Sequence, residues 1–280
     1  MQEGYAVSHL SRSKQPSLEG VDVIQWDVKK GDLEAAAIEA FEHIIHLAGT
    51  GIVDKAWTDE RIREIEESRT KSAKLIIDAV EKNQKKPVSF VSASAVGYYG
   101  FQTSEHVYKE ADEPADDVIA ETCIAWEKQV DEMQQLGVPT AKIRIGLVLS
   151  EKGGALKEMA KPFKLGFGAA LGSGKQYMPW VHIDDLCRLF IKAMEEKWTG
   201  VYNGAAPNQV NNQQFSKVLA KTLHKPFFLP NVPAFVMRMI LGSRARLVLE
   251  GSRVSTKKVQ EKGFDFTYHK LEEALRDIYR

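Results

Sequence analysis

The fold of this chain is decided by residues 87–149, which read PVSFVSASAVGYYGFQTSEHVYKEADEPADDVIAETCIAWEKQVDEMQQLGVPTAKIRIGLVL. Two β-rich runs, 87–94 and 140–149, flank a helical pattern over 118–136 whose apolar residues recur at spacings of four and three. Parallel strands need a long crossover, and that crossover is usually a helix. This segment therefore predicts a βαβ unit.

The same alternation extends toward the N-terminus. Residues 5–10, 21–26 and 43–49 are further β-rich runs. A long helix is expected over 58–82, because the acid-rich start at Thr58 suits the positive end of a helix dipole. Strands that alternate with helices predict an α/β fold with a doubly wound parallel sheet, covered by helices on both faces.

The texture of the sequence changes after Ser150. Glycines punctuate residues 153–174, which we predict to be loop and irregular structure on the substrate side. An extended piece then runs into a helix capped by Asp184, and a strand (200–206) and two helices (211–223 and 271–278) follow. We expect a first domain at 1–150 and a smaller C-terminal domain at 151–280, with about 179–205 returning to the first.

Composition narrows the classes of partner. The 38 basic residues balance the 38 acidic ones, so the chain has no net charge that would attract nucleic acid or an anionic membrane. A small-molecule partner is expected. Cys123 and Cys187 have no partners at metal-ligand spacing, so we predict neither a metal site nor a disulfide, and a reducing cytoplasm. No apolar run of membrane-spanning length and no signal peptide are recognised.

One short apolar segment, FVMRMILG at 235–242, has two interpretations. Phe235, Met239 and Leu241 are expected to belong to the core of the C-terminal domain. The alternative is a helix on a membrane surface or against a partner, since the run is too short to span.

Six phrases, taken together, resemble a known family. The chain is similar to extended short-chain dehydrogenase/reductases, and more closely to their atypical epimerase-family branch with a characteristic C-terminal domain. The resemblance covers essentially the whole chain and implies a Rossmann-type fold. The phrases are HLAGTGIVDKAWTDERIREIEESR (46–69), SFVSASAVGYYG (89–100), AWEKQV (125–130), RIGLVLSEKGGAL (144–156), GSGKQYMPWVHIDDL (172–186) and GFDFTYHKLEEALRDI (263–278).

The resemblance also implies a unit that this sequence does not contain. Proteins of this type open with a central strand and a glycine-rich turn that lets the cofactor pyrophosphate approach a helix N-terminus. Residues 2–12 resemble instead the end of the first helix and the second strand. We therefore expect an upstream extension that carries G-x-x-G-x-x-G.

Residues after the second and third strands are candidates for the cofactor site. Arg12 follows the second strand, where an arginine accommodates the 2′-phosphate, so NADP is the predicted cofactor; a solvated loop arginine is the alternative. Ser11 and Ser13 would add hydroxyl donors. By resemblance Asp27 would accept from the adenine amino group, although a turn aspartate fits equally well.

Further cofactor contacts are expected beside the fourth and fifth strands. The cofactor would pass close to Leu47, Ala48 and Gly49, where small residues leave the backbone accessible. His46 is interpreted as a core histidine. Ser92 lies on the same side of its strand as Ser94 and is included in this set, and Ser68 stands where the class usually has an asparagine.

The catalytic residues of the class are only partly present. By resemblance Ser94 would orient the substrate oxygen, while Ile119 and Cys123 stand where the tyrosine and lysine of the proton relay belong. No Y-x-x-x-K occurs in this helix, so the standard relay is absent. Either another acid or base serves, or the protein binds NADP without turnover. The candidates for that acid or base are Tyr98, Tyr99, Glu127 and His182. The two tyrosines fit walls of the substrate pocket equally well, and His182 is more simply the end of a strand before a capped helix.

The predicted function is therefore that of an NADP-binding oxidoreductase or epimerase acting on an unassigned small molecule, with a nucleotide sugar as one candidate. The alternative is a non-catalytic NADP-responsive sensor or scaffold. The resemblance implies a homodimer through the helices at 58–82 and 118–136. The substrate pocket would be lined, by position, by Arg144, Lys175, Tyr177 and Trp180, each with a packing or exposed role as the alternative.

Overall fold

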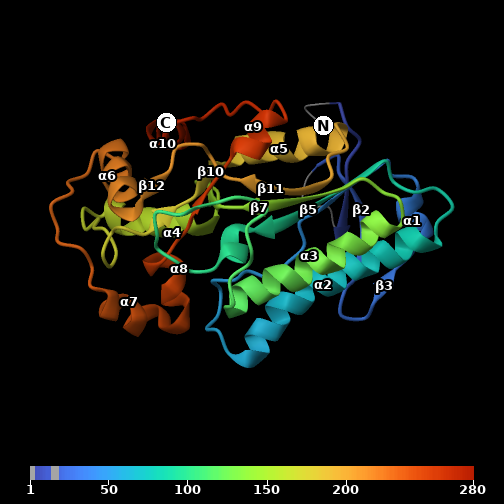
Figure 1. Ribbon diagram of the computed structural model, residues 1–280, viewed down its shortest axis with the longest axis horizontal. Helices are drawn as coiled ribbons and strands as arrows, with labels where there is room; N and C mark the ends of the chain where they lie inside the picture. Colours follow the sequence, from blue (N-terminus) through green and yellow to red (C-terminus); the bar gives the residue numbers. More distant parts are fainter. Residues whose placement is uncertain (1–3, 14–18) are drawn as a thin grey trace.

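A four-stranded parallel sheet lies at the centre of the computed structural model, which describes residues 4–13 and 19–280 (Figure 1). Every neighbouring pair in this sheet is parallel, and each strand is joined to the next through helical segments. The doubly wound α/β architecture is therefore confirmed. In spatial order the strands are β11 (Gly200–Gly204), β7 (Thr140–Ile145), β5 (Ser89–Ala95) and β4 (His43–His46).

Helices cover both faces of this sheet. Figure 1 shows α2 (Asp59–Lys82) and α3 (Val118–Gln135) on one face, and α5 (Ile183–Glu195) with α9 (Lys257–Glu261) on the other. Both long helices begin where the sequence predicts, because a side-chain oxygen caps each N-terminus: Thr58 accepts from Arg61, and Asp117 accepts from the first turn of α3.

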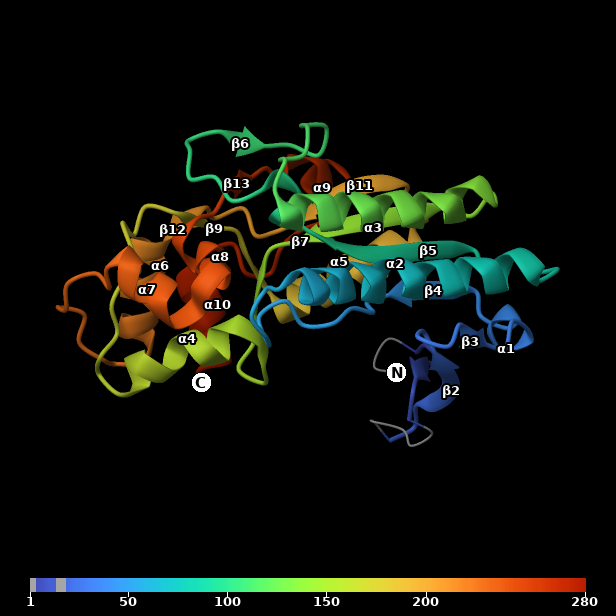
Figure 2. The ribbon, with the colours of Figure 1, turned by 90° about the horizontal axis from the view of Figure 1, so that it is seen from below.

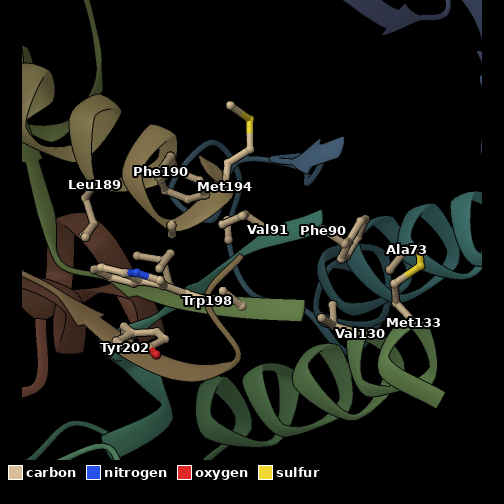
Figure 3. Close-up of a cluster of buried hydrophobic side chains, with 14 of the residues drawn as sticks. Ala73, Phe90, Val91, Val130, Met133, Leu189, Phe190, Met194, Trp198 and Tyr202 are labelled. Carbon is tan, nitrogen blue, oxygen red and sulfur yellow. The ribbon is translucent and has the colours of Figure 1, made fainter. Parts of the chain in front are cut away.

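The core is built from alternate residues of the central strand β5. Phe90 packs toward Ala73 and the apolar face of α3, whereas Val91 points to the opposite face, toward Phe190 and Met194 of α5 (Figure 3). Both residues are fully buried. Burying each such side chain contributes roughly 1.5–3 kcal/mol, so the two-sided burial of β5 holds the layers together.

A second, smaller sheet carries the N-terminal part of the described chain. It contains β1 (Ser8–Ser11), β2 (Asp22–Asp27) and β3 (Asp32–Leu33), and it is followed by α1 (Ala36–Glu39). Figure 2 shows this sheet set apart from the central one. Among residues 4–13 and 19–280, β1 pairs with β2 and β4 pairs with β5, but β1 and β4 do not pair with each other.

A cavity of about 280 Å³ separates the two sheets. Residues 8–10 line one side and residues 43–48 line the other, with apolar side chains of β2, α1 and α2 between them. Within the described residues, β1 and β4 therefore face each other across this space and do not pair.

The C-terminal part is assembled from short pairs of strands and helices. Its strand pairs join segments far apart in the sequence, so that β6 meets β13 and β9 meets β12. The elements are β6 (Val107–Tyr108), β8 (Leu147–Leu149), β9 (Tyr177–Met178), β10 (Trp180–His182), β12 (Val210–Asn211), β13 (Arg253–Val254), α4 (Gly154–Lys164), α6 (Asn212–Thr222), α7 (Ala234–Leu241), α8 (Arg246–Leu249), α10 (Leu271–Ile278) and the 3₁₀ helices η1 (Val96–Tyr99) and η2 (Gly242–Ala245).

Two sequence-based predictions of strand and loop are wrong. The run 140–149 is two strands, because at Gly146 the chain leaves the central sheet and β8 pairs with β10. A β-carbon at Gly146 would lie 2.1 Å from the carbonyl oxygen of Pro179, so only glycine permits this approach. The segment 154–164 is a helix despite its glycines and Pro162, since it buries Leu156 and Phe163.

Two predictions about helices are also wrong. The cap of α5 is His182 rather than Asp184: its Nδ1 accepts the Asp184 amide at 3.1 Å. In α7, Phe235 and Met239 are 65% and 75% exposed, so they do not belong to the core. Over the part of the chain that the structure describes, no helix combines the length and apolarity needed to cross a membrane.

Candidate functional site

The ends of β1 and β4 bring the predicted cofactor residues to one cavity. Leu47 and Ala48 line it directly, as does Leu10, the residue before Ser11. Arg12 is exposed at the end of β1, and Gly49 is exposed after β4. The predicted cofactor contacts at the end of β1 and those after β4 therefore lie on opposite sides of this cavity.

Asp27 and Ser92 have other partners in this structure. Asp27 is half-buried, and one of its carboxylate oxygens accepts the backbone N–H groups of Lys29 and Lys30, as a turn aspartate does. Ser92 is fully buried, and its hydroxyl lies 2.9 Å from Nδ1 of His46. Both side chains therefore organise the strand ends next to the cavity.

His46 is a core histidine, as interpreted from the sequence. It is 1% exposed, and its Nε2 lies 2.8 Å from the hydroxyl of Ser72. Burial, and next to it the charge of Arg69, lower the pKa of this histidine to about 4. The ring is therefore neutral at physiological pH.

Three side chains of α2 hold the loop that follows β4. Ser68 accepts the amide of Thr50 at 3.0 Å, and Arg69 donates to the carbonyl of Thr50 at 3.1 Å. Arg61 donates to the carbonyl of Gly51. The two arginines were missed by sequence reasoning; their spacing of eight residues, which places them on one side of α2, was the available signal.

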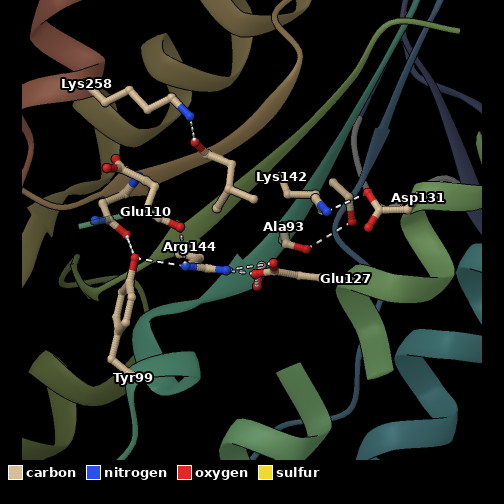
Figure 4. Close-up of polar contacts among 12 residues, drawn as sticks. Ala93, Tyr99, Glu110, Glu127, Asp131, Lys142, Arg144 and Lys258 are labelled. Carbon is tan, nitrogen blue, oxygen red and sulfur yellow. Dashed lines mark hydrogen bonds and ion pairs between the residues drawn. The ribbon is translucent and has the colours of Figure 1, made fainter. Parts of the chain in front are cut away.

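A buried ion pair lies at the carboxyl end of β5 (Figure 4). Arg144 of β7 donates two hydrogen bonds, of 2.8 and 2.9 Å, to the carboxylate of Glu127 of α3, and both residues are at most 6% exposed. The hydroxyl of Ser94 donates to the same carboxylate at 2.6 Å. Ser94 and Glu127 are thus brought together, but the proton of Ser94 is directed at Glu127.

Tyr99 completes this network from η1. Its hydroxyl donates to Asn203 at 2.8 Å and accepts from Arg144 at 2.9 Å (Figure 4). Burial raises the pKa of Tyr99 to about 12, although Arg144 acts to lower it. Tyr99 is 1% exposed, so it is a structural hydrogen-bonding group in this conformation.

Tyr98 is the most accessible of the three predicted catalytic residues. It is half-buried, and its ring centroid lies 3.3 Å from Cζ of Arg144. The guanidinium of Arg144 therefore packs on one face of the Tyr98 ring. Arg144, expected as a possible pocket wall, instead connects Tyr98, Tyr99 and Glu127.

Apolar packing fills the face of α3 on which the proton relay of the class would lie. A β-carbon at Gly97 would meet Ile119 at 2.8 Å and the sulfur of Cys123 at 3.8 Å, so η1 lies directly on both residues. Burial raises the pKa of the Cys123 thiol to about 12. Neither residue can exchange a proton there, which agrees with the predicted loss of the relay.

His182, the other acid/base candidate, faces the C-terminal helix. Its Nε2 lies 3.6 Å from Asp277 of α10, and its ring stacks 3.9 Å from that of Tyr268. Because Nδ1 accepts the amide of Asp184, the neutral ring carries its proton on Nε2, which is buried and makes no hydrogen bond to the described residues. This arrangement leaves His182 no free nitrogen lone pair for a cation, although the carboxylates of Asp184 and Asp277 lie close to its ring.

Two family matches cover most of the chain. Residues 1–205 match the NAD dependent epimerase/dehydratase family, and residues 232–278 match a domain of unknown function, DUF1731. The chain therefore belongs to the NAD dependent epimerase/dehydratase family. The resemblance and the Rossmann-type fold are confirmed.

Within this family the chain is similar to epimerase family proteins of the SDR39U1 and YfhF kind. It is 33% identical to epimerase family protein YfhF of Bacillus subtilis over 281 residues, which cover 99% of this chain and 90% of that protein. It is 38% identical to the chloroplastic SDR39U1 homolog of Arabidopsis thaliana over 239 residues, 84% of this chain and 67% of that one. The crystal structure of human SDR39U1 (isoform 2) with NADPH superposes with a TM-score of 0.86 at 28% identity and covers 99% of this chain and 92% of that chain.

The neutrality of His46 predicts a pH dependence of stability. The pKa of His46 is 6.5 in the unfolded chain and about 4 in the folded protein, so the unfolded state takes up a proton first as the pH falls. The free energy of unfolding should therefore fall by about 2 kcal/mol between pH 7 and pH 5 from this group alone. Urea unfolding of wild type and His46→Gln at both pH values measures it; equal pH slopes in the two proteins would contradict the assignment.

The Glu127–Arg144 pair predicts non-additive effects on stability. Glu127→Leu should lower the free energy of unfolding by about 3–5 kcal/mol, because it leaves the Arg144 guanidinium buried and unpaired. The double variant Glu127→Leu/Arg144→Met should recover much of this loss. Denaturant unfolding of the full double-mutant cycle tests it, with Glu67→Gln in an exposed ion pair as control. Additive losses would show that the two side chains do not act as a pair.

Proposed function

We propose that this protein binds NADP and acts as an oxidoreductase or epimerase on a small molecule, with a nucleotide sugar among the candidates. The observation that carries the proposal is the exposed Arg12 at the end of β1, across the cavity from the loop after β4. A guanidinium at this place in a dinucleotide fold is suited to a 2′-phosphate. The NADPH bound by human SDR39U1 supports the choice of cofactor.

The residues present fit such a cofactor at two points. Among the described residues Arg12 makes no ion pair, and its backbone carbonyl accepts from the side chain of Gln25. At Gly49 the backbone is exposed, which allows a ligand to approach closely. When bound, NADPH supplies a hydride, so the chain's own residues must orient the ligand and manage the proton.

Proton transfer would have to differ from that of the class. Ser94 donates to Glu127, and Tyr99 donates to Asn203, so both protons are engaged within the protein. Tyr98 is the remaining predicted acid with an accessible ring. We assign it the position beside the substrate, with Cζ of Arg144 lying 3.3 Å from the centroid of its ring.

The packed face of α3 favours a second candidate function. With Ile119 and Cys123 under Gly97, a protein that binds NADPH and responds to it without turnover is also supported. A screen for NADPH oxidation with carbonyl compounds and nucleotide sugars separates the two functions. Turnover that is lost in Tyr98→Phe supports the enzyme, whereas tight NADPH binding without turnover supports the sensor.

Cofactor choice can be tested through Arg12. Arg12→Ala should weaken NADPH binding by about tenfold to a hundredfold, because a charge-assisted contact to the 2′-phosphate is lost. NADH lacks that phosphate, so its affinity should not change and serves as the internal control. Fluorescence titration of both nucleotides measures this. A wild-type chain that binds neither form of NADP at millimolar concentration would refute the proposal.

We also propose a homodimer through α2 and α3, which lie side by side on one face of the sheet (Figure 1). Sedimentation equilibrium on the chain tests it. The expected result is a species of twice the 31.4 kDa chain mass.

A further inference from the structure

Arg69 is a partly buried cation whose protein partners are all neutral. It lies on α2 and has intermediate exposure. One terminal nitrogen donates to the carbonyl of Ile65 at 2.8 Å and to the hydroxyl of Ser68 at 3.4 Å, and the other donates to the carbonyl of Thr50. None of the carboxylates in residues 4–13 and 19–280 forms an ion pair with it.

The groups that surround Arg69 supply no negative charge. His46 on β4 is neutral, and Cys123 on α3 remains a thiol because its pKa is about 12. The ring of Trp126 lies 5.2 Å from Cζ of Arg69, and Arg61 adds a like charge. Burial is the largest of the effects that lower the pKa of Arg69.

The other two buried arginines of this region differ from Arg69. Arg144 binds both oxygens of Glu127, and Arg61 lies 2.6 Å from Glu64 and 3.8 Å from Asp54. Burying a charge without a counterion is costly, so proteins usually pair it. Arg69 is therefore a cation for which the described fold provides hydrogen bonds but no anion.

Arg69 also lies beside the predicted path of the ligand. A β-carbon at Gly49 would be 3.1 Å from its Cζ and 3.3 Å from its Nε, so the absence of a side chain at Gly49 makes room for the guanidinium. Gly49 directly follows Leu47 and Ala48, which line the cavity between the sheets. The guanidinium thus lies against the loop after β4, next to the residues that line the cavity.

Two N–H groups of Arg69 are left for a ligand. A guanidinium has five N–H donors, and the three hydrogen bonds leave one on Nε and one on a terminal nitrogen. Arg144 uses the same two kinds of nitrogen to hold Glu127. Phosphate and carboxylate groups match this donor pair.

We propose that Arg69 is an oxyanion-binding residue, which pairs with a phosphate or carboxylate group of the bound ligand. The inference rests on the proposed function only for the position of the ligand. The oxyanion can belong to the cofactor or to an anionic substrate, and competition between the two distinguishes these sources.

The test measures binding of inorganic pyrophosphate and of malonate by calorimetry, and thermal unfolding with and without them. Wild type should bind at least one of these anions, with an affinity that falls as salt rises. Arg69→Met should weaken this binding at least tenfold, and Arg69→Lys, which keeps the charge but loses the fork, by a smaller factor. Arg63→Met, at an exposed position of the same helix, should bind as wild type does.

Stability without ligand provides the second readout. Arg69→Met removes a charge that has no counterion and, with it, the hydrogen bond to the carbonyl of Thr50. These two effects oppose each other, so its unfolding temperature without anion should stay close to that of wild type. A clear decrease would show that Arg69 serves the fold and would overturn the proposal, as would unchanged anion binding in both Arg69 variants. A wild type that binds neither anion would overturn it as well.

Competition with NADPH identifies the source of the oxyanion. Displacement of NADPH by pyrophosphate through Arg69 assigns the residue to the cofactor phosphates, whereas malonate binding alongside NADPH assigns it to an anionic substrate. The outcome is separable from the proposed function. If the protein binds anions through Arg69 but does not bind NADPH, the proposed cofactor is refuted and this inference stands. If the protein binds NADPH through Arg12 and Arg69→Met changes neither NADPH binding nor anion binding, this inference is refuted and the proposed function stands.

Discussion

The buried pair of Arg144 and Glu127 connects the elements that meet at the carboxyl end of the central sheet. Arg144 lies on β7 and Glu127 on α3, and Ser94 joins them from β5. Through Tyr99 the same guanidinium reaches Asn203 of β11. A charge at this depth is tolerated only because every one of its partners is fixed, so the positions of three strands, α3 and η1 become interdependent.

This network explains why residues typical of a catalytic site do not by themselves make one here. Ser94 and Tyr99 have the right residue types, yet their hydroxyl protons are directed at Glu127 and Asn203. The face of α3 beside them is closed by Gly97. Under the proposed function, chemistry at this site would depend on Tyr98, whose ring is the accessible one, and on the ligand itself.

The cations of the region divide the site into a structural and an open part. Arg144 and Arg61 have carboxylate partners and hold backbone in place. Arg12 and Arg69 have none among the described residues, and each lies beside one side of the cavity between the two sheets. Under the proposed function, these two cations would face the anionic groups of the bound dinucleotide.

The order of elements could be predicted because it depends on local patterns. Periodic apolar residues, with the acid-rich start after Thr58, predict α2 and α3 to within a residue, and alternation of strands with helices predicts the parallel sheet. The break at Gly146 was missed because its cause is the carbonyl of Pro179, 33 residues away in the chain. The helix α4 was missed because the glycines around it outweighed the spacing of its buried residues.

The sequence by itself determined the α/β architecture, which follows from residue types at fixed spacings, and through its resemblance to known proteins it indicated the family and the loss of the tyrosine and lysine. Only the tertiary structure decided which side chains are free. Whether Ser94, Tyr99 or Arg69 has a partner depends on residues brought together from distant parts of the chain, and the energy of a buried polar or charged group is set by those partners rather than by its neighbours in sequence.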